Sequence, residues 1–274
     1  PPERRAEVLG WISAATSAGV VIGAEFGSLT YQLGRSGPGF VAAGLCLVNV
    51  LFALKWLTEP GEVKSANAPR RSLSKSMIEV LEHPADPAPS LIWVYAVGMM
   101  AFMAMNAVLA LLLKHRFGIT EFEVGHYYAY IGVISVVMRA LLLGPMVRRF
   151  GEIRVLRMGT GALVIGLAAM PLATNMLTLA IAVLFVPVGT ALLFPSTTAL
   201  LSRLAPRGET GQVMGVQQAF GGVSRLVGPI WAGAAYQHFG ASSPFWIAAG
   251  LMVGVNLLAR RISEPTPITP HEPE

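Results

Sequence analysis

The sequence predicts an all-α membrane protein with eight transmembrane helices. Three observations support this: hydrophobic residues make up 54% of the chain and charged residues only 13%, long apolar runs recur, and part of the chain is repeated. Soluble domains carry about 25% charged residues, whereas a helix that crosses a hydrocarbon core of about 30 Å needs about 20 apolar residues. The composition therefore excludes an ordinary soluble domain.

The apolar runs follow one another along the whole chain, separated by polar connections. Their approximate ranges are 8–33, 37–57, 90–113, 123–147, 155–174, 177–202, 211–238 and 243–261. With this topology, most of the 20 Lys and Arg residues lie on the side that holds the polar segment before the first run. By the positive-inside rule this side is the cytoplasm. We therefore expect a multi-pass protein of the cell membrane with both ends of this chain in the cytoplasm.

A shift of about 205 residues maps one Gly-containing segment onto another, and a long-period repeat indicates a duplicated unit. The matching positions include Gly10 and Gly215, Gly23 and Gly228, and Tyr31-Gln32 and Tyr236-Gln237. The chain then holds one full unit of six spans, preceded by the end of another. We expect a fragment organised as 1–57, a two-helix remnant of an N-terminal bundle; 58–89, a cytoplasmic central linker; 90–262, a C-terminal six-helix bundle; and 263–274, a cytoplasmic tail.

The linker 58–89 is rich in Pro, Ser and charge. Within it, Leu73, Met77 and Leu81 recur at four-residue spacing beside basic residues. That pattern is typical of an amphipathic helix on an anionic membrane surface, and a solvated linker helix is the alternative.

The first predicted span carries four glycines, Gly10, Gly19, Gly23 and Gly27. Small residues at such spacing let two membrane helices pack closely, which is one interpretation. The spacing also resembles the antiporter signature on the fifth helix of the major facilitator superfamily, with Ala24 in place of that signature's proline.

A second signature lies between the fourth and fifth predicted spans. Gly144, Arg149 and Gly151 match the cytoplasmic loop motif of the same superfamily by position. Arg148 stands where the family usually has Asp, and Glu152 where it usually has Arg. The alternative is two loop glycines beside positive-inside arginines.

The resemblance to this superfamily covers nearly the whole chain. It implies a twelve-helix protein of two bundles, of which this chain holds helices 5–12, and transport of a small solute by alternating access. Within the superfamily the chain is most similar to drug/proton antiporters such as tetracycline-type exporters, which implies proton-coupled efflux of a drug or metabolite. An uptake symporter of the same superfamily and a non-transporting scaffold or receptor are the alternatives. Membrane lipids, a small-molecule substrate and protons are the expected partners, and the full-length protein is expected to be a monomer.

Three ionisable residues fall inside predicted spans: Glu25, Arg139 and Arg225. A charge inside the membrane is costly and marks a functional candidate, so these are candidates for proton coupling or gating, with structural pairing as the alternative. In the superfamily arrangement we expect Glu25 to pair with Arg139. The candidates for polar groups that line a cavity are Tyr95, Asn106, Thr197 and Thr198, the last two in a span that two prolines interrupt.

No pattern for soluble-enzyme chemistry is found. The five histidines are scattered without metal-ligand spacing, and no Gly-rich phosphate-binding loop of the Walker type is present. We therefore expect no catalytic residues, no metal, no cofactor and no nucleic-acid partner.

Overall fold

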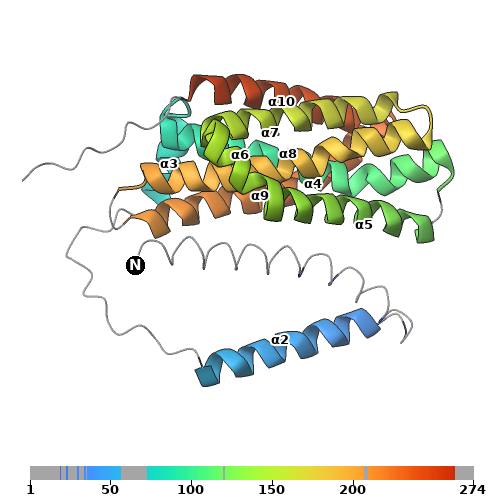
Figure 1. Cartoon of the computed structure of the whole chain (residues 1–274), viewed down its shortest axis with the longest axis horizontal. Helices are drawn as coiled ribbons and strands as arrows, with labels where there is room; N and C mark the ends of the chain where they lie inside the picture. The colour runs from blue at the N-terminus through green and yellow to red at the C-terminus, as the bar shows by residue number, and fades with distance from the viewer. Residues whose placement is uncertain are drawn as a thin grey trace, which may run out of the picture. The chain divides into compact units, whose positions relative to one another are not determined.

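The computed structural model describes residues 36–56, 73–119, 121–206 and 209–262, together with residues 19, 23, 30 and 34. Every regular element in these ranges is helical (Figure 1). In chain order the elements are α2 (Gly37–Trp56), α3 (Leu73–Glu82), α4 (Pro87–Phe117), α5 (Glu121–Val137), the π-helix η1 (Met138–Leu142), α6 (Leu143–Phe150), α7 (Glu152–Ala169), the 3-10 helix η2 (Met170–Leu172), α8 (Met176–Leu204), α9 (Thr210–Phe239) and α10 (Ser243–Arg261). The prediction of an all-α membrane fold is confirmed. The predicted span 8–33 lies almost entirely outside the described residues.

The chain divides into two compact units between Arg71 and Ser72. In the first unit, α2 is an apolar helix that ends in a ring pair, with Phe52 and Trp56 stacked at 4.7 Å between centroids. The ammonium group of Lys55 lies 4.7 Å from the centroid of the Trp56 ring. Aromatic and basic residues at a helix end are typical of the boundary between membrane and water.

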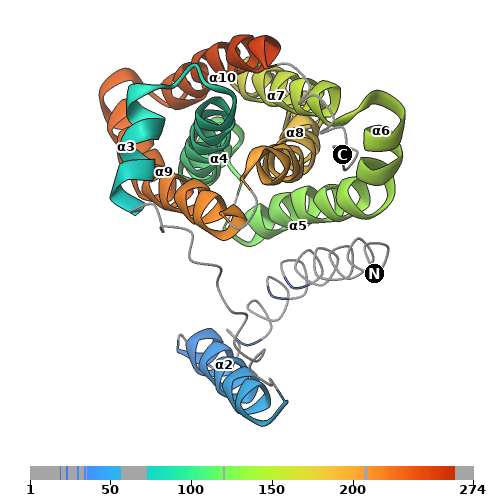
Figure 2. The ribbon, with the colours of Figure 1, turned by 90° about the vertical axis from the view of Figure 1, so that its left-hand side faces the viewer.

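The second unit is built around α4 and α8. Helices α7 and α10 pack against each other and cover α8 and α4 on one side, while α5 packs on α8 and α9 packs on α4. Figure 2 shows α4 and α8 enclosed by the other helices when the unit is viewed from one end. The two central helices therefore carry most of the buried core.

Six described stretches are long and apolar enough to cross a membrane: Gly37–Trp56, Pro87–Phe117, Tyr127–Phe150, Glu152–Leu172, Met176–Leu204 and Ser243–Arg261. Their bounds lie within a few residues of the predicted ranges. Helix α9 is as long as these but less apolar, because glycines, glutamines and Arg225 interrupt its apolar residues.

Helices α7 and α8 approach each other at backbone distance. A Cβ on Gly159 would lie 2.8 Å from the backbone nitrogen of Leu193, and a Cβ on Gly189 would lie 2.8 Å from the backbone oxygen of Gly159. Small residues on both helices make this approach possible, as is common where membrane helices pack.

Arg157 of α7 binds the end of α10. Its Nε donates to the backbone oxygen of Ala259, and its Nη2 donates to those of Arg260 and Ile262, all at 3.0–3.1 Å. The last carbonyls of a helix have no partner within the helix, and a cation there also favours the helix dipole. Arg157 therefore caps α10 and joins it to α7.

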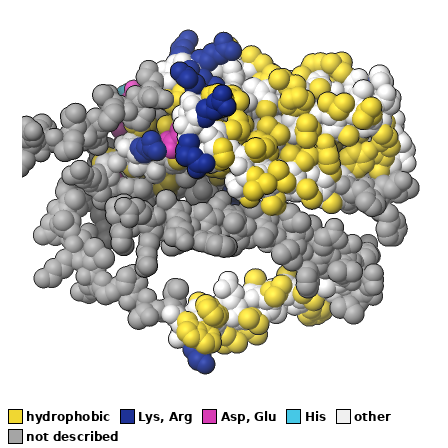
Figure 3. Space-filling view, viewed as in Figure 1, with side chains coloured by type: hydrophobic (Ala, Val, Ile, Leu, Met, Phe, Trp, Pro, Cys, Tyr) yellow, Lys and Arg dark blue, Asp and Glu magenta, His cyan; other side chains and the backbone are white. Residues whose placement is uncertain are grey.

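Basic residues gather at one end of the second unit. In Figure 3 Lys and Arg side chains cluster at that end, and hydrophobic side chains cover most of the rest of the visible described surface of this unit. The end of α6, the start of α7 and the ends of α8 and α10 supply the basic residues Arg148, Arg149, Arg154, Arg157, Arg203, Arg260 and Arg261.

The linker 58–89 contains the helix α3, which packs against α4 and α9. The Trp93 indole nitrogen donates to the backbone oxygen of Val80 at 3.0 Å, and Val80 is buried. Met77 and Leu81 stay exposed. The predicted apolar stripe is thus not the surface that attaches this helix to the bundle.

Candidate functional site

One face of α4 carries the candidates Tyr95 and Asn106. Together with Met99 and Phe102 they are spaced three or four residues apart, so they share one face of the helix. Tyr95 is 5% exposed, and its ring meets Phe194 of α8 edge to face at 5.3 Å between centroids. Phe102 meets the same ring at 6.4 Å. We call Tyr95, Phe102 and Phe194 the aromatic cluster.

Helix α9 approaches this cluster through glycines. A Cβ on Gly221 would lie 2.7 Å from Cε1 of Tyr95, and a Cβ on Gly228 would lie 2.8 Å from the backbone oxygen of Met100. Arg225 follows Gly221 by one helical turn. Because Cα–Cβ bonds in a helix tilt toward its N-terminus, the stem of Arg225 starts toward the turn that contains Gly221. The side chain of Arg225 itself is exposed in the part of the chain that the structure describes.

Gln217 lies one turn before Gly221 and is 0% exposed. Its Oε1 accepts a long hydrogen bond, 3.4 Å, from the hydroxyl of Thr198 on α8. Its Nε2 has no hydrogen-bond partner in the ranges that the structure describes. Leaving a buried polar group unbonded costs about 1–3 kcal/mol, so such a group in a native protein calls for a partner such as a water or a bound molecule.

Helix α5 packs mainly on α8 and reaches α4 at Asn106. The hydroxyl of Tyr128 donates to the backbone oxygen of Asn106 at 3.2 Å. Arg139 lies eleven residues further along the same span, in the π-helical stretch Met138–Leu142, which packs on α8. The Nε of Arg139 is buried and makes no hydrogen bond to any described residue.

Arg139 belongs to the π-helical stretch Met138–Leu142, which interrupts the span between α5 and α6. Its neighbour Met138 is buried among Val155 of α7 and Ala191 and Leu192 of α8. Short π-helical stretches are rare and are often found at functional sites. The packing of Met138 thus holds this stretch against α7 and α8 next to the position of Arg139.

Tyr95, Arg139 and Arg225 lie in the interiors of their spans. Helices α4 and α9 begin, and α6 ends, at the end of the bundle that carries α3 (Figure 1). At about 1.5 Å per residue, Tyr95 is about 12 Å, Arg139 about 16 Å and Arg225 about 22 Å from that end of its own span. The three positions thus lie between about two fifths and about three quarters of the way across a hydrocarbon core of about 30 Å.

The hydroxyls of Thr197 and Thr198 behave differently. Thr197 is fully buried, and its hydroxyl lies 2.9 Å from the backbone oxygens of Leu193 and Phe194, so it is bonded within α8. Thr198 reaches Gln217 on α9 instead. The structure therefore brings the side chains of Tyr95 and Thr198 into contact with neighbouring helices. The hydroxyl of Thr197 stays within its own helix, and so does the side-chain amide of Asn106, whose Nδ2 donates to the backbone oxygen of Phe102 at 2.8 Å.

Sequence analysis did not single out Phe194, Gln217 or Tyr128. Charges and prolines stand out in an apolar span, whereas a neutral amide or an aromatic ring gives a weak signal. For Gln217 one signal was available. It lies four residues before Gly221 and eleven before Gly228, on the stripe of small residues by which α9 packs against α4.

The second candidate site is the predicted loop between the fourth and fifth spans, and here the prediction of a loop was partly wrong. Gly144, Arg148 and Arg149 lie in α6, which continues to Phe150. Only Gly151 separates α6 from α7. Its φ of 80° is in the region that favours glycine, and its N–H donates to the backbone oxygen of Val147 at 2.9 Å. Helix packing extends into this segment, so the motif is a helix end with a one-residue turn.

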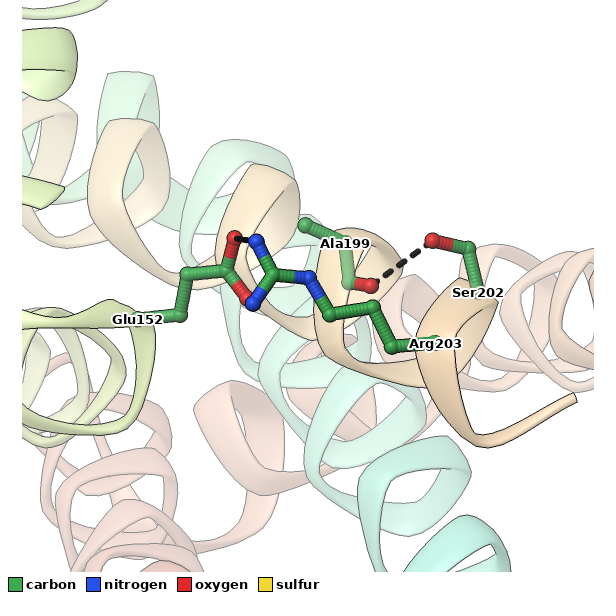
Figure 4. Close-up of polar contacts among 4 residues, drawn as sticks. All are labelled: Glu152, Ala199, Ser202 and Arg203. Atoms are coloured by element: carbon green, nitrogen blue, oxygen red, sulfur yellow. Dashed lines mark hydrogen bonds and ion pairs between the residues drawn. The ribbon is translucent and has the colours of Figure 1, made fainter. Parts of the chain in front are cut away.

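Directly after this turn, Glu152 forms an ion pair with Arg203 at the end of α8. Figure 4 shows the two side chains facing each other, with 2.8 Å between Nη2 of Arg203 and Oε1 of Glu152. The side chain of Glu152 is 10% exposed and that of Arg203 is 64% exposed. An acid in the first turn of one helix and a base in the last turn of the next both suit the helix dipoles. Glu152, which departs in sign from the superfamily motif, thus has a basic partner on α8.

The antiporter-type motif and Glu25 fall largely outside the described residues. Of these positions only Gly19 and Gly23 are described, whereas Gly10, Glu25 and Gly27 are not. Within the described ranges, no three or more His, Cys, Asp and Glu side chains are placed to hold a metal ion.

Relatives of known identity cover most of this chain. Multidrug resistance protein 2 of Bacillus subtilis (strain 168) is 25% identical over 261 residues, which is 92% of this chain and 63% of the relative. Tetracycline resistance protein, class C, of Escherichia coli is 24% identical over 256 residues, which is 93% of this chain and 63% of the relative. The chain thus spans a little under two thirds of the length of these relatives.

Solved structures share the fold. The crystal structure of the human organic anion transporter MFSD10 (TETRAN) matches with a TM-score of 0.70 and 21% identity over 90% of this chain and 64% of that one. A bacterial homologue of the iron transporter ferroportin, in an outward-facing state, matches with a TM-score of 0.72 and 19% identity over 97% of this chain and 65% of that one.

The family model described as Major Facilitator Superfamily matches residues 1–186 and again residues 140–274. Together the two matches cover the whole chain. This is a family of membrane transporters and not of enzymes. The chain is therefore a multi-pass membrane protein that belongs to the Major Facilitator Superfamily.

Proposed function

We propose that the full-length protein is a secondary active transporter that moves a small solute across the membrane by alternating access, and that it exports a drug or metabolite in exchange for protons. Family membership and the multidrug and tetracycline resistance relatives support this proposal. The observation that carries it is the position of Arg139 and Arg225 in the interior of the membrane, on helices that flank α4 and α8. A charge at that depth is costly unless it serves transport or is paired.

The solute path in this proposal follows the face of α4 and α8 that lies between α5 and α9. Tyr95, Asn106 and Thr198 supply polar groups there, and the aromatic cluster supplies an apolar surface. Transporters of this kind bind their solutes near the bilayer midplane. At about 1.5 Å per residue, Tyr95 is about 12 Å, Asn106 about 28 Å and Thr198 about 9 Å from the end that carries α3, so these polar groups are spread along the proposed path.

Glu25 is the proposed proton-coupling residue, with Arg139 and Arg225 as partners in coupling or gating. It is the carboxylate in the interior of a predicted span of this chain. The test is transport by the full-length protein in proteoliposomes with an imposed pH gradient. We expect Glu25→Gln to abolish the dependence of transport on the gradient. Normal gradient dependence in this variant would mean that the coupling group lies elsewhere.

The turn between α6 and α7 is the proposed gating element. A Cβ on Gly144 would have Nη1 of Arg148 as its nearest atom, at 3.6 Å. Because the new methyl group meets no close contact, replacing Gly144 by Ala tests the conformational step of transport without disturbing helix packing. We expect replacement of Gly144 or Arg149 to lower the turnover number of transport more than the solute affinity. Unchanged turnover in both variants would reduce the motif to a topological anchor.

The proposed orientation places the basic end of the second unit in the cytoplasm, by the positive-inside rule. Single cysteines introduced at Arg154 and at Lys114, at opposite ends of the bundle, test it in intact cells after replacement of Cys46. A membrane-impermeant thiol reagent is expected to label the cysteine at 114 and not the one at 154. The reverse labelling would invert the topology.

A further inference from the structure

We propose that α3 is an interfacial helix that inserts Met77, Ile78 and Leu81 among the acyl chains of the adjoining lipid leaflet, which is the cytoplasmic leaflet in the proposed orientation. The partner is the lipid surface itself, and the inference goes beyond the transport function, which requires no such contact. Met77 is 36%, Ile78 49% and Leu81 57% exposed, so the part of the chain that the structure describes leaves much of this surface uncovered. We call these three residues the exposed stripe.

One side of α3 is attached to the bundle by two hydrogen bonds. The hydroxyl of Ser76 accepts from Nε2 of Gln212 on α9 at 2.9 Å, and the backbone oxygen of Val80 accepts from the indole nitrogen of Trp93 on α4 at 3.0 Å. Val80 is only 4% exposed. These contacts fix the rotation of α3 about its own axis, so they also fix the direction in which the exposed stripe points.

The exposed stripe lies between the attached side and a charged side. Both Glu79 and Glu82 are exposed. Successive residues of an α-helix are about 100° apart, so the attached side, the exposed stripe and the two glutamates point in three directions separated by roughly 110–130°. A helix at the edge of a membrane protein meets three surroundings in this arrangement: protein, acyl chains and water. An amphipathic helix in that position buries its apolar side in lipid and keeps its charged side in water.

The depth of α3 agrees with the boundary of the hydrocarbon core. Helix α4 has 31 residues, which is about 46 Å at about 1.5 Å per residue. The core is about 30 Å thick, so a centred α4 extends about 8 Å beyond it at each end. Trp93, which holds Val80, is about 9 Å from the start of α4. Helix α3 is therefore attached near the boundary between headgroups and acyl chains, where tryptophan is enriched.

The position of α3 on the bundle also favours contact with lipid. In Figures 1 and 2, α3 lies crosswise to the long helices at one end of the unit, and Figure 2 shows it on the outside of that end, beside α9 and α10. Only residues 83–86 separate α3 from α4. The hydroxyl of Ser90 donates to the backbone oxygen of Pro84 at 2.8 Å and holds this turn. A helix held crosswise on the outside of a membrane bundle has lipid on the side away from the protein.

The test measures the depth of nitroxide spin labels in the full-length protein, reconstituted in nanodiscs of phosphatidylcholine and phosphatidylglycerol. Single cysteines replace Ile78, Leu81 or Glu82 after the change Cys46→Ser. Each label is relaxed by oxygen, which concentrates in lipid, or by a nickel chelate, which stays in water. We expect oxygen to dominate at Ile78 and Leu81, as at the reference Ile165, which is 52% exposed within a span. The nickel chelate should dominate at Glu82.

Two results would overturn the inference. Dominant relaxation by the nickel chelate at either Ile78 or Leu81 would mean that the stripe lies in water. Protection of both labels from both reagents, with the spectra of immobilised labels, would mean that protein covers the stripe, for example the first unit of this chain or a second copy.

Variants then test whether the stripe itself holds α3 in the leaflet. With the label on Met77→Cys, the double change Ile78→Asp and Leu81→Asp should shift the dominant relaxation from oxygen to the nickel chelate, because carboxylates are costly among acyl chains. The matched control, Glu79→Gln with Glu82→Gln, alters the charged side and should leave the label in lipid. An unshifted label in the aspartate variant would contradict contact of the stripe with acyl chains. If size-exclusion chromatography shows that this variant does not fold, the labels at Ile78 and Leu81 decide alone.

Discussion

The close approach of α7 and α8 at Gly159 and Gly189 makes a sharp prediction about stability. In Gly159→Ala the new methyl group would lie 2.8 Å from the Leu193 nitrogen, 2.9 Å from Cβ of Leu192 and 3.0 Å from the Gly189 oxygen. Two of these three atoms belong to the backbone of α8 and cannot rotate away. The helices have to separate by several tenths of an ångström, which loosens the packing of both.

Overpacking of this kind costs about 1–3 kcal/mol, and alanine has a helix propensity about 1 kcal/mol better than glycine. The matched control is Gly161→Ala, two residues along the same helix. There the nearest atom to the new methyl group would be Nδ2 of Asn256, at 3.8 Å. The propensity gain is common to both variants, so the difference between them isolates the helix contact.

The assay is reversible unfolding, or a thermal shift where unfolding is irreversible, of the full-length protein in detergent. We expect Gly159→Ala to be about 1–3 kcal/mol less stable than Gly161→Ala. We also expect Gly159→Ala and Gly189→Ala to be less than additive, because a separation forced by one methyl group makes room for the other. Equal stability of Gly159→Ala and Gly161→Ala would refute the backbone-contact reasoning.

Three further predictions concern single contacts. Arg157→Ala should destabilise the protein by about 1.5–3 kcal/mol, since it removes charge-assisted hydrogen bonds to the end of α10. The control Arg154→Ala, at an exposed position, should change the unfolding free energy by less than about 0.5 kcal/mol. Equal effects of the two variants would contradict the role of Arg157 as a cap of α10. Gln217→Leu should leave the unfolding free energy unchanged or raised, because it removes an unbonded buried amide, while weakening solute binding; a large loss of stability would mean that Nε2 is bonded in the folded protein. Gly151→Ala should cost about 1–3 kcal/mol of backbone strain at its positive φ, measured by thermal unfolding; a stable variant would show that the turn readjusts easily.

Much of the fold could be predicted from hydrophobicity alone. A membrane helix must satisfy its backbone hydrogen bonds within itself and be apolar along its length, so run length gives the spans to within a few residues at most ends. The basic residues at the ends of α6, α8 and α10 could be predicted equally well, because Lys and Arg gather in the connections on one side of a membrane protein.

Contacts between helices could not be predicted in this way. Residues 148–150 were expected outside the fourth span, because arginines usually mark connections, yet these residues continue the helix. In α3, the predicted stripe of Met77 and Leu81 is exposed while Val80 is buried, since the partner surfaces of α4 and α9 decide which side is covered. Gln217 is neutral and sits among glycines, so its buried and partly unbonded amide appears only once α8 is placed beside α9.

The one-residue turn at Gly151 restricts how the second unit can move. Because helices adjoin Gly151 on both sides, the end of α6 and the start of α7 stay within a few peptide lengths of each other, at about 3.8 Å per residue. The angle between the two helices can change at this turn, but they cannot slide past each other. Arg157 ties α7 to the end of α10, and the Glu152–Arg203 pair ties its start to the end of α8. A displacement of one of these four helix ends is therefore passed to the other three, so in the proposed transport cycle the basic end of the unit would move as a single block.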